Sequence, residues 1–62
     1  MCIELIGVVD GRVLERTTFD DLDYAAIGER YRQLKDNERM KLVVTCDGEP
    51  ILGDQQVRRF CR

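Results

Sequence analysis

The fold is decided by residues 2–18, CIELIGVVDGRVLERTT. Aliphatic residues dominate from Cys2 to Val9, the pair Asp10-Gly11 interrupts them, and Val, Leu and Thr resume from Arg12 to Thr18. An Asp-Gly pair tolerates the positive φ angles of a tight turn, whereas the flanking residues favour extended backbone. The stretch therefore predicts a β-hairpin with one strand on each side of the turn.

A second stretch near the end of the chain repeats this pattern. A β-branched run covers Lys41 to Cys46, the turn pair Asp47-Gly48 follows, and Glu49 to Leu52 supplies the returning strand. Pro50 lacks an amide hydrogen, which confines it to an edge strand or to a position whose nitrogen faces away from the neighbouring strand. We therefore expect a second hairpin whose last strand lies at an edge of the sheet.

The residues between the two hairpins, Phe19 to Asn37, predict one helix. Asp20 can accept hydrogen bonds from the free amides at a helix start and is expected to be the N-cap. Phe19 and Tyr24 then occupy the two positions of a hydrophobic staple. Apolar residues recur at spacings of three and four, at Tyr24, Ile27, Tyr31 and Leu34. One face of this helix is therefore expected to pack on the sheet.

The segment after Gly53 permits two interpretations. With Asp54 as a cap, Val57, Phe60 and Cys61 would fall on one side of a short helix, whereas in a strand Val57 and Cys61 would share one side. We favour the helix. The expected fold class is α+β, with two antiparallel β-hairpins flanking one central helix (β-β-α-β-β), a short C-terminal helix, and a single domain over residues 1–62.

The composition is that of a small folded protein. The chain has 62 residues, of which 44% are hydrophobic and 35% charged, and its net charge is -2. A domain of this size hides only about 60% of the surface of its unfolded chain, so a deep ligand pocket is not expected. The apolar run Leu5 to Val9 is far shorter than a membrane span and no basic secretory signal precedes it, so we expect a cytoplasmic protein.

Residues that carry chemistry are sparse. The chain has no histidine and no serine, the commonest general base and the commonest hydroxyl nucleophile. The three carboxylates within residues 20–23 are better explained by a helix start than by a metal site. The cysteines are odd in number and have no CxxC pair; we expect them to be reduced packing residues, with a three-thiolate metal site or an intermolecular disulfide as the other interpretation. They are Cys2, Cys46 and Cys61. We therefore expect no enzyme activity, catalytic residue, cofactor or metal.

The feature that points toward function is a pair of strands that are apolar on both faces. In the first strand Leu5 and Gly7 alternate with Ile6 and Val8, and in the third Val43 alternates with Val44. An antiparallel sheet with one face in water normally alternates apolar and polar residues. A single helix covers only one face, so the C-terminal segment, a second copy of the chain or a different partner must cover the other.

The leading hypothesis is a non-catalytic protein–protein interaction module. Its general build is that of a small acidic inhibitor or accessory protein of phages or mobile elements, which would bind a host macromolecule as a monomer or as a homodimer. The alternative is a small nucleic-acid-associated regulator that places the C-terminal arginines on phosphates, although the acidic chain makes nucleic acid the less favoured partner. The residues expected to contact a partner are Val43, Thr45, Val57, Arg58, Arg59, Phe60 and Arg62. The sequence leaves open the partner's identity, the strand order and the register of the first hairpin.

Overall fold

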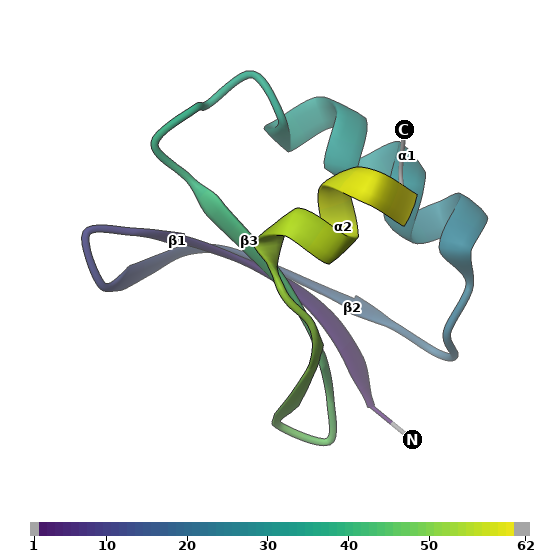
Figure 1. Ribbon diagram of the computed structural model, residues 1–62. Helices are drawn as coiled ribbons and strands as arrows, with labels where there is room; N and C mark the ends of the chain where they lie inside the picture. The colour runs from purple at the N-terminus through teal and green to yellow at the C-terminus, as the bar shows by residue number, and fades with distance from the viewer. Residues whose placement is uncertain (1, 61–62) are drawn as a thin grey trace.

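The computed structural model describes residues 2–60 as a four-stranded antiparallel sheet with two helices. The elements are β1 (Ile3–Val9), β2 (Arg12–Phe19), α1 (Tyr24–Leu34), β3 (Lys41–Cys46), β4 (Glu49–Leu52) and α2 (Asp54–Phe60). The strand order is β2-β1-β3-β4, so β1 and β3 lie in the centre and the two hairpins join through them (Figure 1). The predicted α+β class, the helix after Gly53 and the edge position of the strand with Pro50 are confirmed.

Both hairpin turns have the geometry that the Asp-Gly pairs predict. Asp10 and Gly11 have φ angles of 51° and 79°, and Asp47 and Gly48 have φ angles of 52° and 87°. Two consecutive residues with positive φ are the signature of a type I′ turn, whose twist matches that of the flanking strands. The paired residues that flank the first turn, Val9 and Arg12, show that its loop has two residues. This settles the register that the sequence left open.

A β-bulge separates the two halves of the first hairpin. Gly7 pairs with Glu15 and Val8 pairs with Val13, so Leu14 is an extra residue and two residues of β2 oppose Val8. A Cβ atom on Gly7 would overlap Sδ of Met40. Any larger residue here would force the Met40 side chain to shift, because that side chain lies directly on the strand.

Both helices pack on the same side of the sheet (Figure 1). α1 lies against β2, and α2 lies against β3 and β4. The buried residues form one cluster between these two layers, made of Ile3, Leu5, Ile27, Tyr31, Met40, Leu42, Val44 and Val57. The sequence left three alternatives for what covers the second face of the sheet. The C-terminal segment, as far as Phe60, does not cover that face, because the buried Val57 places α2 on the same side of the sheet as α1.

The helix between the hairpins begins later and ends earlier than predicted. Its N-cap is Asp23, whose Oδ1 accepts from the amides of Ala25 at 3.0 Å and Ala26 at 3.3 Å, so the assignment of Asp20 was wrong. The physical reason is that β2 continues through Phe19, which pairs with Ile3. The chain has only just left the sheet at Asp20, so the helix begins later, after Asp23.

The hydrophobic staple moves with the cap. With Asp23 as N-cap, the two staple positions are Leu22 and Ile27, and both pack in the core. The predicted staple of Phe19 with Tyr24 is therefore wrong. At the other end the amide of Lys35 donates to the carbonyl of Tyr31 at 2.8 Å and closes the last turn.

Candidate interaction surface

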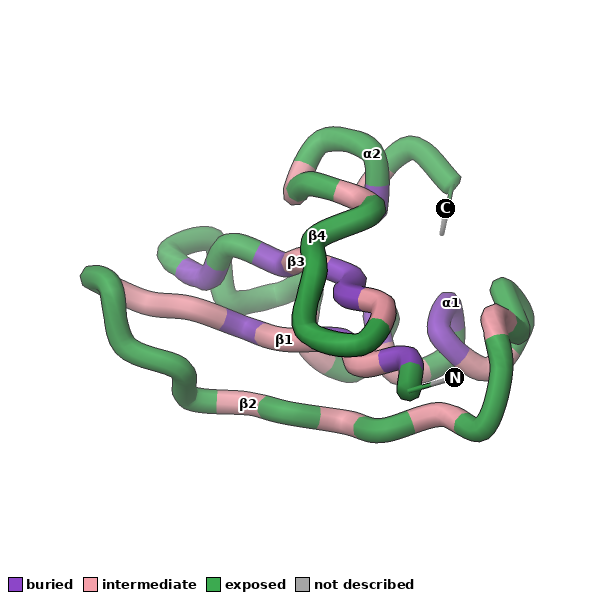
Figure 2. Tube along the Cα trace, turned by 90° about the horizontal axis from the view of Figure 1, so that it is seen from below, coloured by how far each residue is buried: buried purple, intermediate pink, exposed green. Residues whose placement is uncertain are grey.

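The sheet has one side that neither helix covers, and we call it the open face. Side chains alternate along a strand, so the residues that lie between the buried ones in sequence point to this side. Its residues are Glu4, Ile6 and Val8 of β1, Val13, Arg16 and Thr18 of β2, and Lys41, Val43 and Thr45 of β3. Figure 2 shows that β2, at one edge of this face, is largely exposed.

The centre of the open face is apolar. Ile6 pairs with Val43 across β1 and β3, and Val8 pairs with Val13 across β1 and β2. We call these four residues the apolar strip. Val13 is 51% exposed and the other three are half-buried. The strip crosses three strands without a polar interruption, and the exposed Leu14 of the bulge adjoins it.

Polar side chains surround the strip: Glu4 lies toward one end, Lys41 lies toward the other, and Arg16 pairs with Ile6 between them. Glu4 lies in the row that contains Thr18 and Thr45, and its Oε2 is 3.5 Å from Nε of Arg16. Lys41 lies opposite Val8 at the other end of the face. The Arg16 side chain is 59% exposed, so this ion pair adds little stability.

The structure does not bring the predicted contact residues together. Val43 and Thr45 belong to the open face, whereas Val57, Arg59 and Phe60 belong to α2 on the other side. Val57 is completely buried, so the expectation that it touches a partner was wrong: it is a core residue. Arg62 and Cys61 lie outside the described residues.

Thr45 offers little surface of its own. It is 6% exposed, between Glu4 and Pro50 on the neighbouring strands, and its Oγ1 has no hydrogen-bond partner among the described residues. The contact surface of the open face therefore comes from the strip and its charged neighbours. The sequence contained the signal for Ile6, Val8 and Val13 in the alternation of β1 and β2, although the predicted contact residues omitted them.

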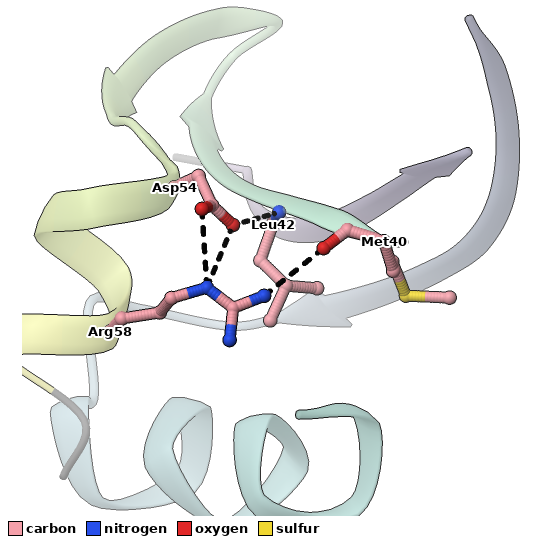
Figure 3. Close-up of polar contacts among 4 residues, drawn as sticks. All are labelled: Met40, Leu42, Asp54 and Arg58. Atoms are coloured by element: carbon pink, nitrogen blue, oxygen red, sulfur yellow. Dashed lines mark hydrogen bonds and ion pairs between the residues drawn. The ribbon is translucent and has the colours of Figure 1, made fainter. Parts of the chain in front are cut away.

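Arg58 is engaged in holding α2 against the sheet (Figure 3). Its Nε is 3.1 Å from Oδ2 of Asp54, and its Nη2 donates to the carbonyl of Met40 at 3.1 Å. The hydrogen bond to Asp54 raises the pKa of Arg58 above its usual value. Because the guanidinium already has these partners, it is a poor candidate for a phosphate contact, and this weakens the nucleic-acid alternative.

Asp54 completes the same tether (Figure 3). Partial burial opposes its ionisation, but hydrogen bonds from the amide of Leu42, at 2.9 Å, and from Arg58 outweigh this effect, so the pKa of Asp54 lies below its usual 3.8. Its carboxylate therefore binds a strand amide and does not cap the helix as predicted. The amide of Gly53 instead donates to Oε1 of Gln56 at 2.8 Å, as in half of a capping box.

The helical side of the molecule carries one exposed aromatic pair. The ring centroids of Tyr24 and Phe60 are 6.1 Å apart, with an interplanar angle of 35°, and the two residues are 48% and 61% exposed. This spacing suits a tilted aromatic contact. The pair joins the start of α1 to the end of α2, so it has a packing role within the chain.

The remaining polar features do not form a chemical site in residues 2–60. A hollow of about 430 Å³ adjoins Phe19 and the acidic segment before α1, and one of about 630 Å³ adjoins the start of α2. No group of three ligating side chains occurs in this part of the chain. Cys2 is exposed and Cys46 half-buried, and both are free thiols. Neither described helix is long and apolar enough to cross a membrane.

Comparisons of the chain with protein-family models, with curated proteins and with solved structures found no match.

Proposed function

We propose that this protein is a non-catalytic interaction module that binds a protein chain through the open face, in the manner of a small inhibitor or accessory protein. The observation that supports the proposal is the apolar strip, which neither α1 nor α2 covers. The face of an antiparallel sheet that meets only water normally carries polar side chains. An apolar centre on that face therefore favours contact with another protein.

The arrangement of the open face resembles that of a protein interface. Such interfaces have an apolar centre and a polar rim. Here the strip is the centre, while Glu4, Arg16 and Lys41 stand around it. Complete burial of a Val or Ile side chain is worth about 1.5–3 kcal/mol, so covering the exposed half of Val13 would contribute about 1 kcal/mol. The half-buried members would add less each, so the rim must take part in binding.

The groups with displaced pKa values support a structural role for the helical side. Asp54 and Arg58 bind each other, the amide of Leu42 and the carbonyl of Met40. Displaced pKa values mark candidate catalytic groups only when the groups are free to act on a substrate. Here they hold α2 on the sheet, so the proposal assigns no reaction to the protein.

Site-specific photo-crosslinking tests the proposal. A photoreactive amino acid replaces Val43 on the open face, and a matched control replaces Gln55, which is exposed on α2. In an extract of the native host, we expect light-dependent protein adducts from position 43 and few from position 55. Unlabelled wild-type protein should compete with adduct formation, and the Ile6→Lys variant should not. Equal yields from the two positions, or equal competition by Ile6→Lys, would refute the proposal.

A further inference from the structure

We infer that the partner adds an extended segment of its own chain to the outer edge of β2, with an acidic side chain beside Arg16. The inference rests on the proposed function, because it specifies how a partner protein reaches the open face. It is supported by the difference between the two edges of the sheet, by the direction of the β2 backbone groups and by the charges along β2.

The two edges of the sheet differ in their protection against strand pairing. β4 has four residues, contains Pro50 and pairs with β3 through a register shift. A short strand, a proline and a bulge all discourage another strand from pairing with an edge. β2 has eight residues and no proline, and its bulge lies near the turn, so residues 15–19 form a regular edge. Within residues 2–60 no strand lies on the outer side of β2 (Figure 2).

The direction of the backbone groups in β1 follows from one hydrogen bond at its start. The carbonyl of Cys2 accepts from the amide of Asp47, just beyond the end of β3, so Cys2 is directed toward β3. Successive residues of a strand direct their N–H and C=O groups to alternate sides. The next residues to face the other way, toward β2, are therefore Ile3, Leu5 and Gly7.

The same alternation identifies the backbone groups of β2 that point away from the sheet. The partners of the β1 residues directed toward β2 are Phe19, Thr17 and Glu15, so these three are directed inward. The residues between them, Arg16 and Thr18, direct their N–H and C=O groups outward. Together they offer two donors and two acceptors at a spacing of about 7 Å. An extended polypeptide carries the complementary groups at the same spacing, so this edge selects a strand as its ligand.

Arg16 selects an acidic strand. Its side chain belongs to the open face and is 59% exposed, and Glu4 lies 3.5 Å away on one side of it. A guanidinium has five N–H groups and can bind a second carboxylate. Neighbouring residues of paired strands share a face, so an acidic residue of the added strand can lie beside Arg16 on the open face.

The only acid of β2 is unsuited to this position, which argues against a second copy of the chain. Glu15 lies on the helical side, where Nη2 of Arg30 is 2.9 Å from its Oε2. A second β2 that continued the sheet with its helices on the same side would therefore place no carboxylate beside Arg16. The complementary charge must come from a different protein.

The apolar part of the open face extends to the same edge. Val13 and Leu14 of β2 are 51% and 58% exposed. Two residues along a strand cover about 7 Å, so an aliphatic residue two positions from the acidic one would lie beside them. The added strand would thus extend the apolar strip across a further strand. The expected ligand is an extended segment with an acidic and an aliphatic residue two positions apart.

Contacts with α1 hold this edge in place before a ligand arrives. Besides its ion pair with Glu15, Arg30 donates from Nε to Oγ1 of Thr17 at 3.0 Å. Both bonds lie on the helical side and leave the outward groups of Arg16 and Thr18 unaffected. An edge that is already ordered loses little conformational entropy on binding, which favours strand addition.

Peptide selection followed by hydrogen exchange tests the inference on the full chain. A library of random twelve-residue peptides supplies the ligands, and we expect those selected to contain an acidic and an aliphatic residue two positions apart. In the unbound protein the amides of Arg16 and Thr18 should exchange faster than that of Thr17, and a bound peptide should slow both. A selection without binders, or binders that leave these two amides unprotected, overturns the inference. Adducts from position 43 would then still support the proposed function, so the two proposals can fail separately.

A proline at the edge tests the backbone contact. Thr18→Pro removes one outward amide, and proline is tolerated on an edge strand whose nitrogen faces solvent. Thr18→Ala is the matched control because it keeps the amide. We expect Thr18→Pro to weaken binding of a selected peptide at least about fivefold and Thr18→Ala less than about twofold. Equal affinities would overturn the inference.

N-methylation of the peptide tests the same bonds from the other side if circular dichroism shows that Thr18→Pro is unfolded. Single N-methyl groups are placed along a selected peptide, and its binding to the wild-type chain is measured. Alternate positions should lose affinity, because only every second amide of an added strand faces β2. A uniform effect along the peptide counts against strand addition.

A charge exchange tests the role of Arg16. Arg16→Glu should weaken binding of the acidic peptide about fivefold, because two carboxylates then lie side by side. A peptide whose acidic residue is replaced by lysine should bind the variant better than it binds the wild-type chain. If the two peptides keep the same order of affinity for both proteins, the assigned charge contact is wrong.

Discussion

Removing the carboxylate of Asp54 should destabilise the protein more than removal of any isolated surface charge. Asp54 is the first residue of α2, and its Oδ1 accepts a hydrogen bond from the amide of Leu42 at 2.9 Å. It also pairs with Arg58, which in turn donates to the carbonyl of Met40. One side chain therefore fastens α2 to the first residues of β3. Without it, both the strand amide and the guanidinium lose a partner.

The two substitutions Asp54→Asn and Asp54→Ala separate the contributions. The Asp54 side chain is 21% exposed, so part of its charge interaction is screened by water. Asn keeps an acceptor for the Leu42 amide but loses the charge that attracts Arg58, and we expect a loss of about 1 kcal/mol in unfolding free energy. Ala also leaves the amide without its acceptor, so we expect about 3 kcal/mol.

Thermal unfolding followed by circular dichroism measures both losses. For a domain of about 60 residues, 1 kcal/mol corresponds to about 8 °C in Tm, so Asp54→Asn should lower Tm by about that amount at pH 7. Glu29→Gln is the matched control, because Glu29 is exposed on α1, and it should change the free energy by less than about 0.5 kcal/mol.

The effect of Asp54 should also depend on pH. Its folded-state pKa is lower than the usual 3.8, so its ionised form stabilises the fold above that value and the stabilisation disappears as the pH falls through the folded-state pKa. The difference between wild type and Asp54→Asn should therefore shrink from pH 7 to about pH 2. If both variants are as stable as Glu29→Gln, or if the difference is the same at both pH values, the role assigned to this carboxylate is wrong.

Two further pairs of substitutions test local features. Asp23→Ala removes the N-cap of α1, so it should lower the unfolding free energy measured by urea titration by about 1 kcal/mol. Asp20→Ala is the control and should lower it by less than about 0.5 kcal/mol; the reverse order would identify Asp20 as the cap. Gly7→Ala should cost about 1–3 kcal/mol because its Cβ would overlap the Met40 side chain. Gly53→Ala, whose Cβ would make only an ordinary contact with Oε1 of Gln56 at 3.7 Å, should cost at most about 1 kcal/mol, and equal effects would contradict the close packing at β1.

The features that could be predicted from the sequence are those whose cause is local. The pairs Asp10-Gly11 and Asp47-Gly48 determine their own φ angles, so both hairpins followed from a few residues. The spacing of Ile27 and Tyr31 likewise placed one face of α1 in the core. In each case the determining residues lie within one or two turns of each other, and no distant contact changes the outcome.

The start of α1 could not be predicted because three aspartates within residues 20–23 are all good capping residues. The choice among them is made by β2, which continues to Phe19 because that residue pairs with Ile3. The tether of Asp54 was missed for a similar reason: an aspartate that begins a helix resembles a cap, while its actual partner, the amide of Leu42, lies 12 residues away in the chain. Both answers depend on contacts that the sequence does not display.

The open face follows from the width of the sheet. Four strands about 4.8 Å apart span about 14 Å, whereas a helix with its side chains is about 10 Å across, so one helix is too narrow to cover one side. α1 covers the part over β2, and α2 covers the part over β3 and β4. Both described helices are therefore used on the same face. Because β1 and β3 carry Ile6, Val8 and Val43 on the opposite face, neither described helix covers these three side chains.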